Sequence, residues 1–389
     1  MNNYTPKIRF CDFSDNWESK QIGELASVAM NKRIFKEETS EVGEIPFYKI
    51  GTFGSEPDSF ITREKFEEYK SKYPYPEIGD ILISASGSIG RTVEYQGEEA
   101  YFQDSNIVWL KHDERLDNSF LKQFYSIVKW QGIEGTTIKR LYNKNILETT
   151  IALPSISEQS AIGSLFRTLD DLLASYKDNL ANYQSLKATM LSKMFPKAGQ
   201  TVPEIRLDGF EDRWEEKGFI QIVNRVTESS DSDSLPKVEF EDIISGQGKL
   251  NKDISSKFDN RKGILFKPGY TLYGKLRPYL NNWLLPKFEG VALGDFWVFD
   301  PNGNNSDFIY YLVQSSRYQK VANDTSGTKM PRSDWKSVST TIFAIPQTIA
   351  EQQAIGAYFS NLDNLINSHQ EKISQLETLK KKLLQDMFI

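Results

Sequence analysis

One pair of carboxylates with a nearby lysine has the residue types of a metal-dependent nuclease centre. Asp58 is followed by Glu68 and Lys70, and many nucleases bind magnesium through carboxylates in this order. The spacing between the two parts is free in such nucleases, however, and the segment REKFEEYK at 63–70 reads as a helix. We therefore interpret the match as chance and keep a nuclease using Asp58, Glu68 and Lys70 as the least favoured function.

Other catalytic centres have few residues to draw on. The 389-residue sequence contains one cysteine, Cys11, and two histidines, His112 and His369, which excludes internal disulfides and cysteine-rich zinc sites. The phosphate-binding loop GxxxxGK[ST] is missing, and Asp300-Pro301-Asn302 fails the Asn/Asp-Pro-Pro-Tyr/Phe motif of adenine methyltransferases. We expect this chain to hold no metal, no cofactor and no catalytic residue.

Residues that could bind a polyanion are more numerous than catalytic candidates. Each half of the chain has a Gly-Thr segment followed by basic residues. These segments are GTTIKRLYNK at 135–144 and GTKMPRSDWK at 327–336. Flexible cationic loops suit a polyanion such as DNA. The predicted phosphate or base contacts are Lys139, Arg140, Lys144, Lys329, Arg332 and Lys336. Solvated surface charge is the alternative for any single one, and their recurrence in both halves favours function.

A second pair of segments differs between the halves. The segment GKLRPYL at 274–280 supplies Lys275, Arg277 and Tyr279, and arginine can address guanine with two hydrogen bonds in the major groove. Arg277-Pro278 could equally brace a turn. The first half has ASGSIGR at 85–91, with candidates Ser86, Ser88 and Arg91. Small polar residues and glycines allow close approach of a backbone, but they also form ordinary turns.

The segments that must position these candidate residues occur as a sequence repeat. The stretch at 156–196 matches the stretch at 349–388 without a gap, at an offset of 193 positions (351 minus 158). A match of this length is a duplication. Neither copy contains an internal proline, and apolar residues recur every three or four positions. Each copy is therefore predicted to be one uninterrupted helix.

An apolar stripe along each helix predicts that the two helices pack against each other. A lone helix with a narrow stripe is not stable in water, and the two stripes match in length and register, although steps of four interrupt a strict heptad. The predicted seam consists of Leu165, Leu169, Leu172, Tyr176, Leu180 and Leu186 with Leu362, Leu365, His369, Ile373, Leu376 and Leu379. We interpret His369 as a packed core histidine rather than a ligand.

The start of each helix carries a Glu-Gln pair, Glu158-Gln159 and Glu351-Gln352. Serine or threonine followed by these residues suits a helix start. We interpret the four residues as capping elements, with a surface for a partner protein as the alternative.

The segments ahead of the helices are also repeated. PKIRFCDFSDNWESK at 6–20 and PEIRLDGFEDRWEEK at 203–217 share proline, isoleucine, arginine and tryptophan at equal spacing, and Trp17 and Trp214 are expected in cores. Each following segment reads as a mixed α/β globule, with strands predicted at 80–84 and 271–273 and helices at 119–131 and 307–321.

The predicted fold class is α+β, arranged as a pseudo-twofold tandem repeat. Two similar globules are expected at 1–153 and 199–345, separated by two long antiparallel coiled-coil helices at 154–198 and 346–389.

Composition describes an ordinary protein of two or more domains, 26% charged and 39% hydrophobic. No apolar run approaches the length of a membrane span and no signal-peptide pattern is visible, so we expect a cytoplasmic protein. The formal net charge of −6 gives no whole-molecule attraction to nucleic acid. DNA binding must therefore depend on local basic patches.

Together these patterns resemble the specificity subunit of type I restriction-modification enzymes. The likeness is carried by the Pro-x-Ile-Arg…Trp openings, GDILIS at 79–84 with its Ser-Gly-Ser-Ile-Gly sequel, GKLRPYL, and the Pro-x3/4-Glu-Gln-x2-Ile helix starts. They follow the order globule, helix, globule, helix and span nearly the whole chain.

The resemblance implies that each globule is a target recognition domain for one half of an asymmetric bipartite DNA site. It implies double-stranded DNA, two methyltransferase subunits and motor-nuclease subunits as partners. S-adenosylmethionine, ATP and Mg²⁺ would be bound by those partners. The main alternative is a coiled-coil scaffold whose two globules bind proteins, since duplicated modules with different loops and an acidic net charge fit it too.

Overall fold

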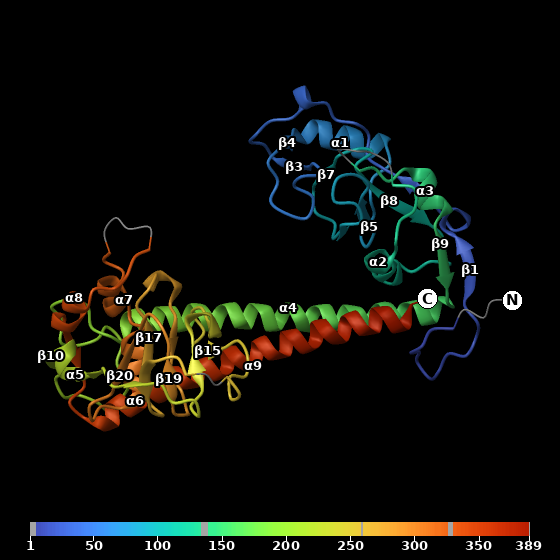
Figure 1. The fold of residues 1–389 in the computed structure, drawn as a ribbon. Helices are drawn as coiled ribbons and strands as arrows, with labels where there is room; N and C mark the ends of the chain where they lie inside the picture. The colour runs from blue at the N-terminus through green and yellow to red at the C-terminus, as the bar shows by residue number, and fades with distance from the viewer. Residues whose placement is uncertain (1–4, 134–138, 258–259, 326–329, 389) are drawn as a thin grey trace. The chain divides into compact units, whose positions relative to one another are not determined.

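The computed structural model describes residues 5–133, 139–257, 260–325 and 330–388. The chain forms two compact units, residues 1–176 with 372–389 and residues 177–371. Each unit contains one globule and a part of both long helices, α4 (Ile156–Lys193) and α9 (Ile349–Met387) (Figure 1). In the described part of the chain, no helix has the length and apolar character needed to cross a membrane.

The globule of the first unit is built on a four-stranded antiparallel sheet in the order β2-β8-β5-β6. These strands are β2 (Ala26–Ala29), β8 (Ile107–His112), β5 (Ile81–Ser84) and β6 (Thr92–Glu94). All four residues of β5 are buried, as an apolar run in an inner strand should be. The predicted strand at 80–84 is β5, and the predicted helix at 119–131 is α2 (Asn118–Ile127).

The second unit repeats this sheet as β11-β20-β17-β18, again antiparallel throughout. Its strands are β11 (Asn224–Val226), β20 (Phe296–Asp300), β17 (Thr271–Gly274) and β18 (Trp283–Leu284). The single helix predicted at 307–321 is two helices, α6 (Ser306–Leu312) and α7 (Ser316–Ala322). The break falls where the Ser315 side chain accepts from the Tyr318 N–H and starts a new helix.

Smaller elements also occur in matching places. Each globule has a second sheet, β4-β3-β7 in the first and β12-β16-β19-β13 in the second, with one parallel pair in each, β3 with β7 and β13 with β19. The strands are β3 (Ile45–Tyr48), β4 (Phe60–Ile61), β7 (Tyr101–Phe102), β12 (Ser229–Ser230), β13 (Lys237–Val238), β16 (Gly263–Phe266) and β19 (Gly290–Ala292).

A two-stranded antiparallel pair precedes each long helix: β1 with β9 ahead of α4, and β10 with β21 ahead of α9. These strands are β1 (Glu18–Gln21), β9 (Thr150–Leu153), β10 (Glu215–Gly218) and β21 (Ile342–Ile345). The remaining elements are α1 (Arg63–Lys72), α3 (Asn143–Glu148), α5 (Phe219–Ile222), α8 (Trp335–Thr340), β14 (Ile243–Ile244) and β15 (Lys249–Leu250), with 3-10 turns at Ile22–Glu24, Lys36–Glu38, Phe240–Asp242 and Pro278–Leu280. The predicted α+β tandem repeat is confirmed.

The long helices run antiparallel within each unit. In the first unit the rings of Phe166 and Phe388 lie 6.2 Å apart and Asp170 pairs with Lys380. In the second unit the rings of Tyr183 and His369 lie 5.1 Å apart, at 68° to each other. As the residue number rises on α4, its contact on α9 falls, which is the order of an antiparallel pair.

One line of buried or half-buried positions on each helix follows a strict heptad, with steps that alternate between four and three residues. On α4 they are Ile162, Phe166, Leu169, Leu173, Tyr176, Leu180, Tyr183, Lys187, Met190 and Met194, and on α9 Ile355, Phe359, Leu362, Ile366, His369, Ile373, Leu376, Lys380, Leu383 and Met387. The two sets are related by the same offset of 193 positions as the sequence repeat (355 minus 162).

Five of the predicted seam residues lie off this heptad. Leu165 is half-buried and packs against the core of the first globule, and the other four are on the surface. Leu172, Leu186, Leu365 and Leu379 are 42%, 37%, 41% and 45% exposed. The seam instead takes the next residue along each helix, Leu173, Lys187, Ile366 and Lys380. At Leu172 and Leu365 the next residue is also apolar, so hydrophobicity alone offers two registers. At Leu186 and Leu379 the seam residue is a lysine, which hydrophobicity does not select, and only the unbroken heptad keeps one line of contact with the other helix.

Each globular core receives the end of the helix from the other repeat. In the first unit the Phe388 ring stacks on Phe120 at 5.1 Å and meets Trp17 edge-on. In the second unit Phe195 packs against Phe308 and Phe359, at 5.8 and 6.0 Å. Trp17 and Trp214 are 3% and 4% exposed, so their predicted core positions are confirmed.

Candidate nucleic-acid interface

In the first globule, the two segments predicted to contact DNA lie side by side. An isolated β-bridge joins Ser86 to Arg140. The N–H of Leu141 donates to the carbonyl of Ala85 (2.8 Å), and the N–H of Gly87 donates to the carbonyl of Lys139 (3.1 Å). The loop that follows inner strand β5 is thereby paired with the basic segment that leads into α3.

The second globule forms the same junction from different residues. A β-bridge joins Leu276 to Arg332, and the N–H of Ser333 donates to the carbonyl of Lys275 (2.9 Å). The N–H of Arg277 donates to the carbonyl of Pro331 (2.7 Å). In both globules, therefore, the loop after the inner strand and the basic segment form one edge, which we call the basic edge.

Arg277 has an unusual backbone at this edge. Its φ of 47° and ψ of 62° are left-handed, and Pro278 begins a 3-10 turn immediately after it. Left-handed backbone is uncommon for a residue with a side chain, and the residue before proline normally avoids helical angles. Arg277 itself is exposed. Its backbone forms part of a turn, as the second interpretation from the sequence predicted. Its side chain remains on the surface, as a DNA contact would require.

Most of the candidate side chains are on the surface of their globules. The exposed ones are Arg91, Ser88, Lys139, Arg140, Lys144, Arg277, Tyr279, Arg332 and Lys336. Lys275 is partly buried, and Lys329 lies outside the described residues. Three of the exposed candidates have intramolecular partners. Arg91 donates from Nη1 to the carbonyl of Phe53 (2.8 Å), Lys144 Nζ lies 3.7 Å from Glu148, and Arg332 donates to the carboxylate of Asp295.

Ser86 is the candidate that the structure contradicts. It is 3% exposed, and its hydroxyl donates to Asn106 Oδ1 at 2.7 Å. Its backbone forms the β-bridge to Arg140. The Ser86 side chain is therefore buried within the globule and engaged with Asn106, and is not presented on the surface.

Sequence reasoning missed two residues at the basic edges, Asn106 and Asp295. Their backbone carbonyls accept from Ala85 and Lys275, at 2.7 and 2.9 Å. Asp295 also binds Arg332, whose pKa it raises through the hydrogen bond. A cavity of about 710 Å³ hollows the surface here and is lined in part by Leu276 and Asp295. Each residue lies directly before an observed strand, β8 or β20, and no sequence pattern had marked either of them as functional.

The first globule is fastened to the start of α4 by buried polar side chains. Glu158, 1% exposed, accepts from Arg9 Nε and Nη2 at 2.7 Å each and from Trp17 Nε1 at 3.2 Å. The hydrogen bonding between Arg9 and Glu158 raises the pKa of Arg9. In the second unit Glu351 accepts from Arg206 (2.7 Å) and Trp214 (3.0 Å) in the same way.

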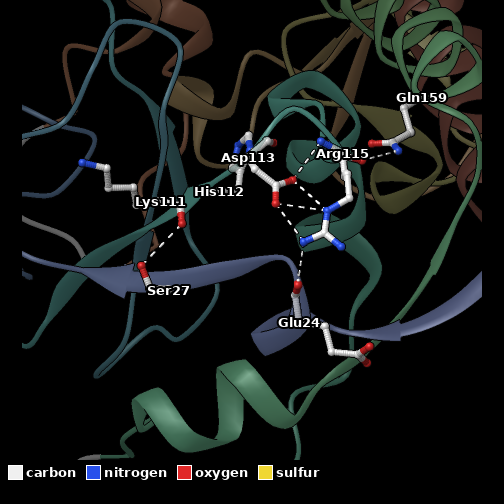
Figure 2. A network of polar contacts seen from close by, with 7 residues as sticks. All are labelled: Glu24, Ser27, Lys111, His112, Asp113, Arg115 and Gln159. Carbon is white, nitrogen blue, oxygen red and sulfur yellow. Dashed lines mark hydrogen bonds and ion pairs between the residues drawn. The ribbon is translucent and has the colours of Figure 1, made fainter.

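The neighbouring Gln159 joins α4 to the loop between β8 and α2 (Figure 2). Its Nε2 donates to the carbonyl of Arg115 at 2.9 Å, and its Oε1 accepts from the N–H of Asp117 at 2.9 Å. Arg115 in turn donates to both carboxylate oxygens of Asp113 and to the carbonyl of Glu24. The guanidinium lowers the pKa of Asp113 to about 2.

The helix-start residues are thus not capping side chains. Glu158, Gln159, Glu351 and Gln352 are at most 2% exposed, which also excludes the alternative that they form a partner surface. The caps are Ser155 and Thr348, whose hydroxyls accept from Glu158 N and Glu351 N at 3.3 Å. The buried Glu-Gln side chains instead form hydrogen bonds to the globules.

The residues of the nuclease alternative have separate partners. Asp58 pairs with Lys49 at 2.9 Å, and Glu68 pairs with Lys72 one turn along α1 at 3.1 Å. Lys70 Nζ lies 5.1 Å from the ring centres of Phe66 and Tyr75. Within the described residues, no group of three or more histidine, cysteine, aspartate or glutamate side chains is placed to hold a metal ion.

The fold and the basic edges define a class of protein: a tandem repeat of two α+β globules, each with a basic edge, joined by a heptad helix pair. The chain belongs to the family described as type I restriction modification DNA specificity domain, which matches residues 14–183 and 216–378. The family predicted from the sequence is confirmed.

Individual relatives agree with this assignment. The chain is 52% identical over 161 residues to a putative type I restriction enzyme specificity subunit of Haemophilus influenzae, a match that spans 41% of this chain and 42% of the relative. It is 21% identical over 420 aligned residues to the putative MjaX specificity subunit of Methanocaldococcus jannaschii, covering 97% and 94% of the two chains. The S subunit structure from M. genitalium has the same fold, with a TM-score of 0.64 at 16% identity over 99% of each chain.

Proposed function

We propose that this chain reads an asymmetric, two-part DNA site and directs adenine methylation by partner methyltransferase subunits and restriction by partner motor-nuclease subunits. The observation that supports this most directly is the pairing of the basic segment with the loop after the inner strand in each globule, by Ser86 with Arg140 and by Leu276 with Arg332. Two segments far apart in sequence supply cations to one surface, which suits contact with phosphates and base edges.

The two half-sites differ because the two basic edges differ. The first edge presents Lys139, Arg140 and the small residue Ser88, while the second presents Lys275, Arg277, Tyr279 and Arg332. Arginine and lysine can bind guanine O6 and N7, and an aromatic side chain can contact a thymine methyl group. A repeated framework with unequal side chains recognises a site with unequal halves.

Exposed leucines beside the helix seam are the observation behind the proposed methyltransferase partners. The first unit exposes Leu172 and Leu379, and the second exposes Leu186 and Leu365. At the offset of 193, Leu172 corresponds to Leu365 and Leu186 to Leu379, so each unit exposes the same pair. Exposed leucines that recur at the same positions in both units fit a surface that a partner covers. We infer that one methyltransferase subunit binds each unit.

In this proposal the partners carry the cofactors. S-adenosylmethionine is bound by the methyltransferase subunits and ATP and Mg²⁺ by the motor-nuclease subunits, while this chain supplies recognition and no catalytic group. The proposal also puts the complex in the cytoplasm, because it acts on DNA.

The test is a genome-wide map of methylated adenines with and without this gene, with complementation by the wild type and by a Lys139→Ala/Arg140→Ala variant. We expect one asymmetric two-part motif to lose methylation on deletion and to regain it only with the wild type. A map unchanged by deletion overturns the proposal. Footprinting of the purified complex separates it from the protein-binding scaffold, which would protect no DNA.

A further inference from the structure

Asn106 and Asp295 occupy the same position in the two globules. Each follows a residue with left-handed backbone, Ser105 (φ 58°) or Gly294 (φ 86°). Each offers its carbonyl to the first residue after the inner strand, Ala85 or Lys275. The turn is therefore built alike in both globules, and the side chain at this position faces the loop of the basic edge.

The side chains make different contacts. Asn106 Oδ1 accepts from the buried hydroxyl of Ser86 at 2.7 Å. The Asp295 carboxylate instead accepts two hydrogen bonds from Arg332, Nε to Oδ1 at 3.3 Å and Nη2 to Oδ2 at 3.0 Å. Lys275 Nζ lies 3.7 Å from Asp295 Oδ1. One carboxylate thus holds two cations, one from each segment of the second basic edge.

The exposure of these groups shows which of them remain available. The Arg332 side chain is 54% exposed, whereas those of Lys275 and Asp295 are 31% and 27% exposed. A guanidinium has five N–H donors, and Asp295 takes two of those on Arg332. The others remain for a ligand, on a group whose orientation is fixed by a bidentate contact.

A carboxylate at a DNA-binding edge has opposing effects. It reduces the positive charge that attracts any DNA, because each neutralised phosphate contributes to affinity whatever the sequence. It also fixes the geometry of an arginine, and recognition of a base requires side chains held by such supporting contacts. A carboxylate at the position of Asp295 therefore lowers the affinity for DNA of any sequence and raises the discrimination between sequences.

We propose that Asp295 is a positioning residue that aligns Arg332 and Lys275 to read the half-site bound by the second globule. The inference rests on the proposed function, since it specifies how one basic edge recognises DNA. It also predicts that the first basic edge, with the neutral Asn106, reads its half-site without such a carboxylate.

The natural sequence supplies the test variant, because asparagine already occupies this turn in the first globule. Asp295→Asn should therefore fold, and Asn106→Asp is the matched control in the other globule. The full-length chain is assembled with its methyltransferase partners. Binding is measured to the cognate duplex and to duplexes in which one half of the site is scrambled, at two salt concentrations.

We expect Asp295→Asn to lower discrimination at one half-site by roughly tenfold, the size of one base contact, and to leave the other half unchanged. Binding to fully scrambled DNA should strengthen by several-fold and the salt slope should steepen by about one. A merely structural role would weaken binding to every duplex. Asn106→Asp should not affect discrimination at the half-site that Asp295→Asn alters.

Two results overturn the inference. If the wild-type complex discriminates both halves and Asp295→Asn does so equally well, Asp295 does not position the reading side chains, while the proposed function stands. If the wild-type complex fails to discriminate either half, the proposed function is wrong and this inference is wrong with it.

Discussion

Lys187 Nζ lies 2.7 Å from Asp363 Oδ1 between α4 and α9 in the second unit, and Lys380 pairs with Asp170 in the first unit. Both lysines occupy heptad seam positions, and the pairs are related by the sequence repeat. A lysine in a seam specifies register at some cost in stability. In the second unit Asp363 also accepts from Tyr311 OH at 2.8 Å, so it joins both helices to the globule.

Asp363→Ala should destabilise the second unit. The substitution leaves the Lys187 ammonium, on a side chain that is 14% exposed, and the Tyr311 hydroxyl without this acceptor. We expect a loss of about 2 kcal/mol in the free energy of unfolding. The triple variant Lys187→Met/Asp363→Leu/Tyr311→Phe replaces all three polar groups by apolar ones and should be near neutral. Urea unfolding measures both variants. A triple variant as unstable as Asp363→Ala would show that the loss comes from packing and not from unpaired polar groups.

Glu158→Ala should loosen the first globule from α4. The change removes the acceptor of Arg9 and Trp17 in a site where Glu158 is 1% exposed, and breaking such a pair costs about 3–5 kcal/mol. Hydrogen exchange should show the loss of protection at residues 5–20 and at the first turns of α4. The matched change Glu351→Ala should act on Arg206 and Trp214 instead. Equal loss of protection in both units from either variant would contradict this account.

Gly163→Ala should destabilise the protein, although alanine favours a helix over glycine by about 1 kcal/mol. A Cβ on Gly163 would lie 1.8 Å from Ser119 Oγ and 2.5 Å from Ser119 Cβ, and overpacking costs about 1–3 kcal/mol. Ser119→Gly removes both clashing atoms and should recover part of the loss in the double variant. Thermal unfolding measures the stability of these variants. A Gly163→Ala variant that is more stable than the wild type would show that α2 and α4 can move apart to make room for the methyl group.

The Asp113–Arg115 contact in Figure 2 should contribute stability that depends on pH. Hydrogen bonds from Arg115 lower the pKa of Asp113 from 3.8 to about 2. Because the folded pKa is the lower one, the contribution is complete above the ordinary value and is lost as the pH falls through about 2. The difference in urea midpoint between the wild type and Asp113→Asn should therefore shrink between neutral pH and pH about 3. A constant difference would exclude an ionic origin.

The repeat, the long helices and the inner strands could be predicted from the sequence because each is encoded by nearby residues. Helical periodicity links positions three and four apart, and a duplication is visible without any contact. The seam was partly mistaken at Leu172 and Leu365, since Leu173 and Ile366 lie beside them and either choice fits a local stripe. The correct register depends on the facing helix, which the local pattern does not contain.

Contacts between distant segments were decided by the tertiary structure. Arg9 meets Glu158 across 149 positions, so nothing near the helix start reveals that the glutamate is buried. Each basic segment was identifiable by composition, yet only the β-bridges of Ser86 with Arg140 and of Leu276 with Arg332 placed them together. The same folding buried Ser86 and brought Phe388 into the core of the first globule. The sequence by itself determined the elements and their duplication, whereas which side chains face each other depended on how the elements pair, because burial and pairing are set by neighbours in space.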